Sequence, residues 1–442
     1  QLIDTVIAQG KKDSLTDYLK GVYADAEFAL NNTNDAAEKQ FLSAVCEGLL
    51  CVKRISEKFA DRADELLISQ PDNINLKRIS VSARHCPWEK PESFYEALNT
   101  YAFMRKVIGS LEGIGPNSFG RVDMDLLPFY EEDIKSGKIT KDEAFELVSQ
   151  FLIIFDCHYD HDMKMESYAD HELENTYVLG GCDKNGEPIF NDLTKIFLRA
   201  NDEEKIIFPK IKCRFSENSP KEYLDMIDEP VIHGTSTILY QNDDASIPAL
   251  IRSGISEEDA RDYIVSGCWG MNENCCGTQD GAYYTNLLKV FEYQIYNRTD
   301  MMEKVGMHFD SIDNAENFEE VYKITCNNIN TLFKERNRIT AIGGHMWEQV
   351  DPLPIFSSLF GDCIKNRRDF TNGGARYNDE CYMCVGFPNI VDSLLAIKTL
   401  CFDKKKYTLK EMLNAVRNNW EGYDEMRHDA VHCCGWGDGS EE

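Results

Sequence analysis

The sequence has 442 residues, of which 43% are hydrophobic, so the chain can bury a large core. Its formal net charge of −29 at pH 7 would repel nucleic acids and anionic membrane surfaces. We therefore expect a small-molecule substrate or a protein partner, with no nucleic acid and no membrane. No apolar run approaches the roughly 20 residues that span a bilayer, and the N-terminus lacks the order of a signal peptide. A soluble, cytoplasmic protein is the expectation.

The 16 cysteines are scattered singly except for Cys275-Cys276, Cys381-x-x-Cys384 and Cys433-Cys434. They are too dilute for a small disulfide scaffold and indicate free thiols in a reducing, anaerobic interior. Four thiolates from the last two groups would make a closed zinc site, but one CxxC and one vicinal pair are a weak signal. The cluster CHYDHD, residues 157 to 162, lacks the i, i+4 pairing of a metal-binding helix. We expect no metal.

The first 75 residues are rich in Ala, Leu, Glu and Lys, with helical periodicity, and predict a packing layer of helices. Helices are predicted to start at three Ser or Thr residues followed by Glu three positions later: Ser93, Thr140 and Thr408. Between the first two of these helices lies a Gly/Pro-rich loop that carries Asn117, Ser118 and Arg121. These three residues are candidates for a substrate pocket. Arg121 is alternatively the structural partner of a buried carboxylate.

Strand-like and helical segments alternate from residue 176 onward. Strands are predicted at 176–179, 211–215 and 235–240, and helices at 191–199 and 220–233. This alternation favours an α/β architecture with a largely buried sheet, either open or closed into a barrel. Further on, amphipathic helices are predicted at 283–297 and 318–338.

The stretch from Ile255 to Cys276 combines a helix start at Ser256, a β-branched run and a small-residue turn that contains Cys268. Ser266 and Gly267 carry no bulk, so this turn can enter a confined space and present the sulfur of Cys268. A buried packing cysteine explains the same pattern.

Six segments then stand in one order: SFYEALNTYAF; SFGRVDMDLLPFYEEDIKSGKIT; LGGCDKNGEPIFNDLT; ISEEDARDYIVSGC; FTNGGARYN; and DSLLAIKTLCFDKKKYTLKEML with WEGYDEMR. Together they cover most of residues 80 to 427 and resemble the glycyl radical enzyme superfamily, the pyruvate formate-lyase and glycerol dehydratase relatives. The resemblance implies a ten-stranded α/β barrel over 76–442, with a thiyl finger loop near 266–270 and a helical region, 1–75, packed on the barrel. It makes Cys268 the predicted catalytic residue.

The resemblance also implies chemistry and partners. A stored glycyl radical takes the hydrogen atom of the cysteine, and the resulting thiyl abstracts hydrogen from a carbon of a small organic substrate. Such a sulfur must be shielded from water and needs no metal. No cofactor is bound directly, because an activating enzyme that uses S-adenosylmethionine and an iron–sulfur cluster installs the radical. The protein is expected to be a homodimeric lyase.

Two departures from the family pattern bear on the reaction. Dehydratase-like members follow the cysteine with x-Glu, a base, whereas this chain has Cys268-Trp269-Gly270. Glu273 or Asp280 is the candidate acid–base group instead, and Trp269 beside the thiol suggests a flatter or less polar substrate. Pyruvate formate-lyase uses two adjacent cysteines, whereas residue 267 is Gly. Acyl transfer is thus disfavoured, and decarboxylation, addition to fumarate, formate acetyltransferase activity and an inactive binding barrel remain as alternatives.

The third departure is that the radical-bearing segment, approximately RVxGY, does not occur in the sequence. Gly422-Tyr423 corresponds instead to an EGY that precedes the radical domain in the family. The sequence allows a truncated product, a radical on a separate subunit or an inactive relative. Truncation is the favoured hypothesis, because the last residues resemble an exposed acidic linker.

Overall fold

The computed structural model divides the chain into two compact units. The described residues are 18–113, 118–156, 176–267, 269–298, 302, 304, 306–344 and 347–439. One unit comprises Gln1–Gln279 and Trp347–Asp379, and the other comprises Asp280–Met346 and Glu380–Glu442. Each unit has its own hydrophobic core. Among the described helices, none combines the length and the apolar character that a membrane span requires.

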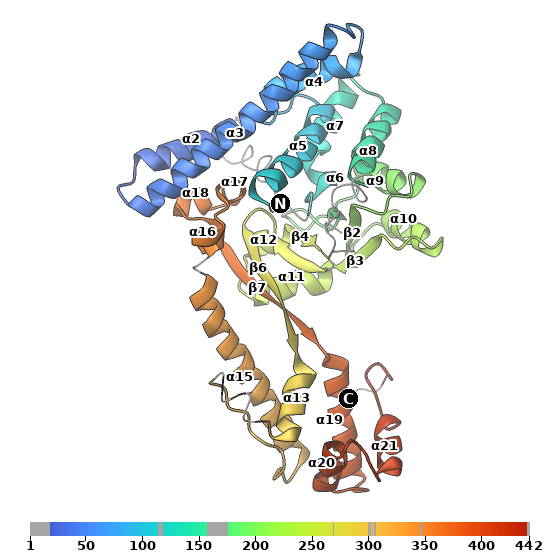
Figure 1. Cartoon of the computed structure of the whole chain (residues 1–442). Coiled ribbons are helices and arrows are strands. Elements are labelled where there is room, and N and C mark those ends of the chain that lie inside the picture. The colour runs from blue at the N-terminus through green and yellow to red at the C-terminus, as the bar shows by residue number, and fades with distance from the viewer. Residues whose placement is uncertain are drawn as a thin grey trace. The chain divides into compact units, whose positions relative to one another are not determined.

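The first unit begins with three helices in which α3 packs against both α2 and α4 (Figure 1). Their bounds are Tyr18–Asn31 for α2, Ala36–Leu67 for α3 and Ile74–His85 for α4. Asp35 caps α3 and Asn73 caps α4, each by accepting backbone N–H groups of the first turn. The buried residues of α3 recur at helical spacing, as Leu42, Val45 and Leu49 illustrate. The described part of this region, from residue 18 onward, is helical.

Four helices follow: α5 (Phe94–Glu112), α6 (Val122–Asp125), α7 (Leu127–Lys135) and α8 (Lys141–Asp156). At α8 the predicted capping box is complete, because Thr140 and Glu143 exchange hydrogen bonds of 2.8 and 3.2 Å. At α5 only half of the box forms. The Ser93 hydroxyl accepts from the N–H of Glu96 at 3.2 Å, but the Glu96 carboxylate accepts from the N–H of Glu92.

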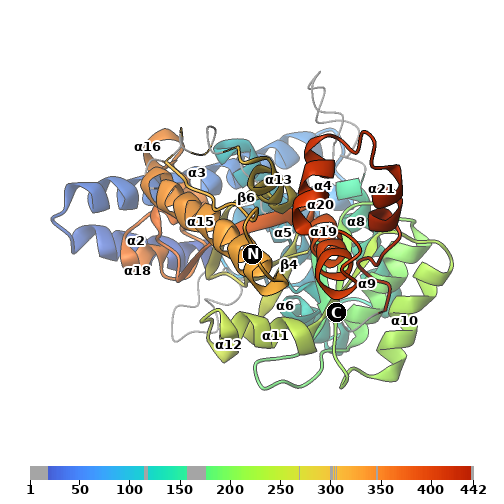
Figure 2. The same ribbon diagram turned by 90° about the horizontal axis from the view of Figure 1, so that it is seen from below.

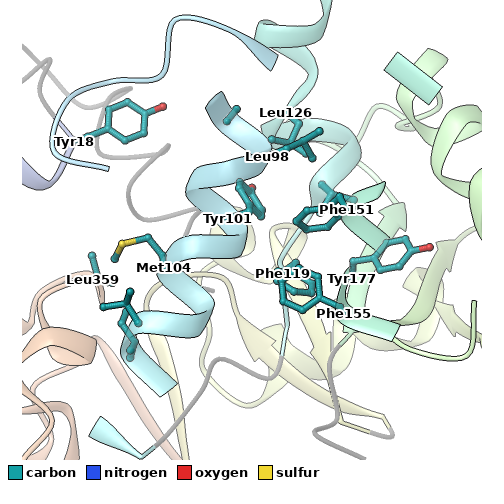
Figure 3. Close-up of a cluster of buried hydrophobic side chains, with 14 of the residues drawn as sticks. Tyr18, Leu98, Tyr101, Met104, Phe119, Leu126, Phe151, Phe155, Tyr177 and Leu359 are labelled. Carbon is teal, nitrogen blue, oxygen red and sulfur yellow. The ribbon is translucent and has the colours of Figure 1, made fainter. Parts of the chain in front are cut away.

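Aromatic side chains from these helices, from the segment before α6 and from the first strand form the centre of this core (Figure 3). Phe119 lies 4.6 Å from Phe155 and 5.3 Å from Phe151 between ring centroids, with tilted or edge-on geometry. Tyr101 of α5 and Tyr177 of β1 are also fully buried. Through this core, the helices α5 and α8 are joined to the sheet that begins with β1.

The predicted alternation of strands and helices is confirmed. Three parallel strands stand in the order β1-β2-β3, with Leu179, Cys213 and Tyr240 in one row of the register. The elements are β1 (Thr176–Gly180), α9 (Asp192–Glu203), β2 (Lys210–Phe215), α10 (Lys221–Ile232), β3 (Ile238–Asn242) and α11 (Asp243–Arg252). A bridge between Ser118 and Thr176 extends the sheet beyond β1. The described residues thus form a small parallel sheet, and a closed barrel of ten strands stays a prediction.

Two further pairs of strands follow the parallel sheet. After α12 (Glu257–Arg261), β4 (Tyr263–Ser266) and β5 (Gly270–Glu273) form an antiparallel hairpin. The long strands β6 (Gly277–Asn286) and β7 (Tyr377–Val385) pair with each other. The remaining short helices of the first unit are α16 (Trp347–Val350), α17 (Pro354–Ser357), α18 (Cys363–Asn366) and η1 (Phe370–Asn372).

The second unit is mainly helical, and its helices α13 and α15 lie side by side in both views (Figures 1 and 2). Its helices are α13 (Leu287–Tyr296), α15 (Phe318–Gly344), α19 (Phe387–Ile397), η2 (Lys398–Asp403), α20 (Leu409–Arg417) and α21 (Asp424–Val431). Thr408 and Glu411 form the predicted capping box of α20. The helix predicted from residue 283 starts later, at Leu287, because the preceding residues pair as β6.

Candidate active site

The β4–β5 hairpin carries the residues around the predicted catalytic cysteine. Ser266 and Gly270 pair in the register, so residues 267–269 connect the two strands. Cys268 itself lies outside the described residues. Asn272 donates a hydrogen bond of 2.8 Å from Nδ2 to the Ser266 hydroxyl, and both side chains are buried. Trp269 has an exposed fraction of 64%.

Arg214 of β2 fixes the first residue of the hairpin to the parallel sheet. Its Nε and Nη2 atoms each donate to the Asp243 carboxylate at 2.9 Å, and Nη1 donates to the carbonyl of Tyr263 at 2.8 Å. The hydroxyl of Tyr263 also donates to Asp243, at 2.7 Å. The guanidinium is fully buried, which opposes its charge, but Tyr263 and Asp243 raise its pKa above the ordinary value.

A second buried arginine, Arg121, holds the base of the hairpin. Its Nη1 donates to Asp262 at 2.9 Å, immediately before β4, and its Nη2 donates to the carbonyls of Gly180 and Cys182 at 3.2 and 2.7 Å. Asn274, immediately after β5, donates to the other oxygen of Asp262 at 3.3 Å. The residue that the sequence offered as a substrate clamp or a carboxylate partner therefore contacts a carboxylate and two backbone carbonyls.

Glu273, a candidate acid–base group, ends β5 and is almost completely buried, with an exposed fraction of 3%. Burial, together with the carboxylates of Asp379 and Asp259, raises its pKa to about 7. Its Oε2 lies so close to Gly277 that a Cβ at that position would overlap it. A carboxyl group with this pKa is present in both protonation states near neutral pH, as an acid–base catalyst requires.

The position of Glu273 differs from that of residue 270, where the family pattern places a base. A strand advances about 3.3 Å per residue, so the two positions lie about 10 Å apart along β5. Side chains alternate between the faces of a strand, so residues 270 and 273 point to opposite sides. Glu273 therefore does not occupy the place of the missing side chain at Gly270.

The other predicted pocket residues are placed only in part. Ser118 is buried, and its hydroxyl accepts from the N–H of Gly120 at 3.1 Å. Asn117 lies outside the described residues. Asp280 belongs to β6, but its side chain is not described.

Sequence reasoning missed two carboxylates that hold this region together, Asp243 and Asp123. Asp123 is fully buried and accepts from the N–H of Gly180 at 2.9 Å and the hydroxyl of Thr194 at 2.8 Å. Burial raises its pKa to about 6. The sequence signal for Asp243 was its partner. Lys210, Lys212 and Arg214 place three cations on one face of β2, whose other face is apolar, and such charges need partners when they are buried.

The Gly-rich segment FTNGGARYN contacts α12, which leads into the hairpin. Both Arg376 and Tyr377 donate to Asp259, at 3.1 and 2.8 Å. The Tyr377 hydroxyl also accepts from the N–H of Ser256 at 3.2 Å. These bonds, with those of Arg214 and Arg121, fix both ends of the connection from α12 to β5.

Comparisons with known proteins connect this arrangement to a family. The family model described as pyruvate formate lyase-like matches residues 11–442. The chain is 28% identical over 441 residues to trans-4-hydroxy-L-proline dehydratase of Clostridioides difficile, covering 96% of this chain and 54% of that protein. It is 27% identical over 405 residues to (2S)-3-sulfopropanediol dehydratase of Klebsiella oxytoca, covering 88% and 48%.

A solved structure is similar as well. The hydroxyproline dehydratase of Clostridioides difficile, determined with trans-4-hydroxy-L-proline bound, superposes with a TM-score of 0.82 at 25% identity, covering 93% of this chain and 54% of that one. This chain spans about half the length of the curated relatives it matches. The resemblance inferred from the six segments is confirmed, and the chain belongs to the pyruvate formate lyase-like family of glycyl radical enzymes.

Proposed function

We propose that this chain contributes the thiyl hairpin of a glycyl radical lyase that cleaves a carbon–heteroatom bond of a small organic substrate. Family membership and two relatives named as dehydratases support this proposal. The observation that carries it is the hairpin anchored by Arg214 and Arg121, which has Cys268 in its three-residue connection.

The reaction that we propose involves the stored radical, the thiol of Cys268 and the substrate. The stored glycyl radical supplies the thiyl by removing the hydrogen atom of Cys268. The sulfur then takes a hydrogen atom from a substrate carbon, and the bond from the neighbouring carbon to its leaving group breaks. The leaving group departs with a proton that originates from a substrate hydroxyl or amine. The product radical recovers the hydrogen atom from Cys268, which regenerates the thiyl.

We assign the transfer of that proton to Glu273, with Asp280 as the second candidate. The pKa of about 7 and the burial of Glu273 support this assignment. Because Glu273 lies at the base of the hairpin, it would reach a substrate group directed away from the sulfur, or act through an intervening water molecule. Asn117, Ser118 and Trp269 complete the proposed pocket, and Arg121 acts as a positioning residue.

The proposal extends to the whole protein and its partners. We propose a ten-stranded barrel in the full-length protein, a helical layer over residues 1–75, a homodimer, a cytoplasmic location and an activating enzyme that uses S-adenosylmethionine. The two relatives are named for a hydroxylated amino acid and a sulfonated diol, which supports a small polar substrate that carries a hydroxyl leaving group.

The full-length protein as the cell makes it, activated anaerobically, tests this function. We expect it to dehydrate a small hydroxylated compound from a panel that starts with trans-4-hydroxy-L-proline and (2S)-3-sulfopropanediol, with products identified by mass spectrometry. Cys268→Ser should abolish turnover, and the control Cys51→Ser, on the exposed surface of α3, should retain it. Turnover that survives in Cys268→Ser would refute the assignment.

A further inference from the structure

A second group of chemically reactive side chains lies in the first unit, away from the hairpin residues. His85 is the last residue of α4, Cys86 follows it, and Glu96 lies in the first turn of α5. Nδ1 of His85 is 3.4 Å from Oε2 of Glu96 and 3.7 Å from Sγ of Cys86. All three potential ligand atoms lie within 4.8 Å of one another.

The two separations that involve His85 match the edges of a tetrahedral zinc site. Zinc binds sulfur at about 2.3 Å and nitrogen or oxygen at about 2.0–2.2 Å. At the tetrahedral angle, those bond lengths separate a nitrogen from an oxygen by about 3.4 Å and a nitrogen from a sulfur by about 3.6 Å. The sulfur of Cys86 and the carboxylate of Glu96 lie within 4.8 Å of each other, so a shared metal requires at most a small approach of these two groups.

The surroundings already hold two of the three ligands. The Glu96 carboxylate accepts a hydrogen bond of 2.7 Å from the N–H of Glu92, and the Cys86 sulfur lies 3.7 Å from the carbonyl oxygen of Glu89. Cys86 and Glu96 are buried, with exposed fractions of 6% and 8%. Without a metal, His85 pairs with Glu96 and the Cys86 thiol donates to the carbonyl of Glu89, whereas a metal would bind all three side chains at one centre.

We propose that His85, Cys86 and Glu96 bind one zinc ion, with a water molecule as the fourth ligand. A neighbouring cavity of about 210 Å³ includes Cys86 and Thr100 in its lining and provides space for entry. The ion would join the C-terminal end of α4 to the first turn of α5, which stabilises the helical layer. The proposal is independent of the radical chemistry and concerns a site that the sequence motifs did not indicate.

The experiment uses the full chain, stripped with chelator, reduced, and titrated with Zn²⁺ against a competing chelator. We expect one tight equivalent in the wild type, and a dissociation constant at least about tenfold higher in His85→Ala, Cys86→Ser and Glu96→Gln. Cys51→Ser, which removes an exposed cysteine of α3, is the matched control and should bind as the wild type does. Circular dichroism checks that each variant is folded, and Glu96→Gln keeps the shape of the side chain if the others fail to fold.

X-ray absorption at the zinc edge then identifies the ligands. The wild type should show one sulfur at about 2.3 Å and lighter ligands at about 2.0 Å, and Cys86→Ser should lose the sulfur shell. The wild type and Cys51→Ser should gain thermal stability from one equivalent of Zn²⁺, whereas the three ligand variants should not. The proposal is overturned if Cys86→Ser binds zinc as tightly as the wild type, or if the wild-type spectrum contains no sulfur ligand.

Discussion

Glu273 shows how burial, reinforced by neighbouring carboxylates, can raise the pKa of a carboxyl group into the range that proton transfer requires. The charged groups that most affect it are the carboxylates of Asp379 and Asp259, and both act in the same direction as desolvation. Gly277 permits this arrangement, because any larger residue would overlap the carboxylate. The local cost of burying the group is the physical origin of its raised pKa.

Replacement of Glu273 should change how stability depends on pH. The folded chain holds this proton more tightly than the unfolded chain, since the pKa rises from its ordinary value of 4.5 to about 7. The stability that the proton contributes is complete below about pH 4.5 and is lost as the pH rises through 7. Glu273→Gln cannot lose a proton, so its free energy of unfolding should fall less than that of the wild type between pH 5 and pH 8, measured with urea.

Glu258→Gln, an exposed change on the neighbouring helix α12, is the control for that measurement and should follow the wild type. If Glu273→Gln also follows the wild type at both pH values, Glu273 does not carry a raised pKa. In the activated full-length protein, loss of a rate change near pH 7 in Glu273→Gln would separate an acid–base role from a structural one.

At the scale of elements, the hairpin depends on contacts that are distant in sequence. Arg214 and Asp243 are 29 residues apart, and Arg121 and Asp262 are 141 residues apart. Each pair joins the hairpin or its base to a different part of the first unit. The four cross-strand pairs of the hairpin hold β4 and β5 to each other. The contacts of Arg214 and Arg121 attach the hairpin to the rest of the first unit.

Removing one partner of the buried pair should therefore be costly. Asp243→Asn leaves the Arg214 guanidinium without its countercharge, and we expect a loss of about 3–5 kcal/mol in the free energy of unfolding. Arg214→Met combined with Asp243→Asn should cost less than the sum of the single changes, because neither charge remains unpaired. Denaturant unfolding measures all three variants.

The matched control for the buried pair is the exposed ion pair between Arg199 and Glu203 of α9. Arg199→Met should cost no more than about 1 kcal/mol, since solvent screens that pair. Equal losses for Asp243→Asn and Arg199→Met would contradict the anchoring role of Asp243.

The sequence predicted those helices and strands that are marked by residue patterns within a short segment. Alternating strands and helices from residue 176, the capping boxes at Thr140 and Thr408, and a β-branched run at β4 were all readable. The strands β6 and β7 were missed because their polar sequences become strands only by pairing with each other across about a hundred residues of chain.

The same distinction holds at the candidate site. Motif order led to the prediction that Cys268 is catalytic and drew attention to Arg121. The partners of Arg121 and the whole Arg214–Asp243 pair arise from packing between distant segments. The cluster of His85, Cys86 and Glu96 was equally invisible, since two helix ends had to meet before its ligands came together.

At the scale of the whole molecule, the chain matches about half the length of enzymes whose names describe dehydration. Its fold is similar to that of the corresponding portion of one such enzyme. We propose that this portion contributes the cysteine that transfers a hydrogen atom between the stored radical and the substrate.

The most direct test is electron paramagnetic resonance of the full-length protein and its Cys268→Ser variant after anaerobic activation. We expect a glycyl radical signal of similar intensity in both proteins, with substrate turnover in the wild type only, because the variant stores the radical but cannot pass it on. Turnover in Cys268→Ser, or an activated wild type without a glycyl radical signal, would contradict the proposed role of Cys268.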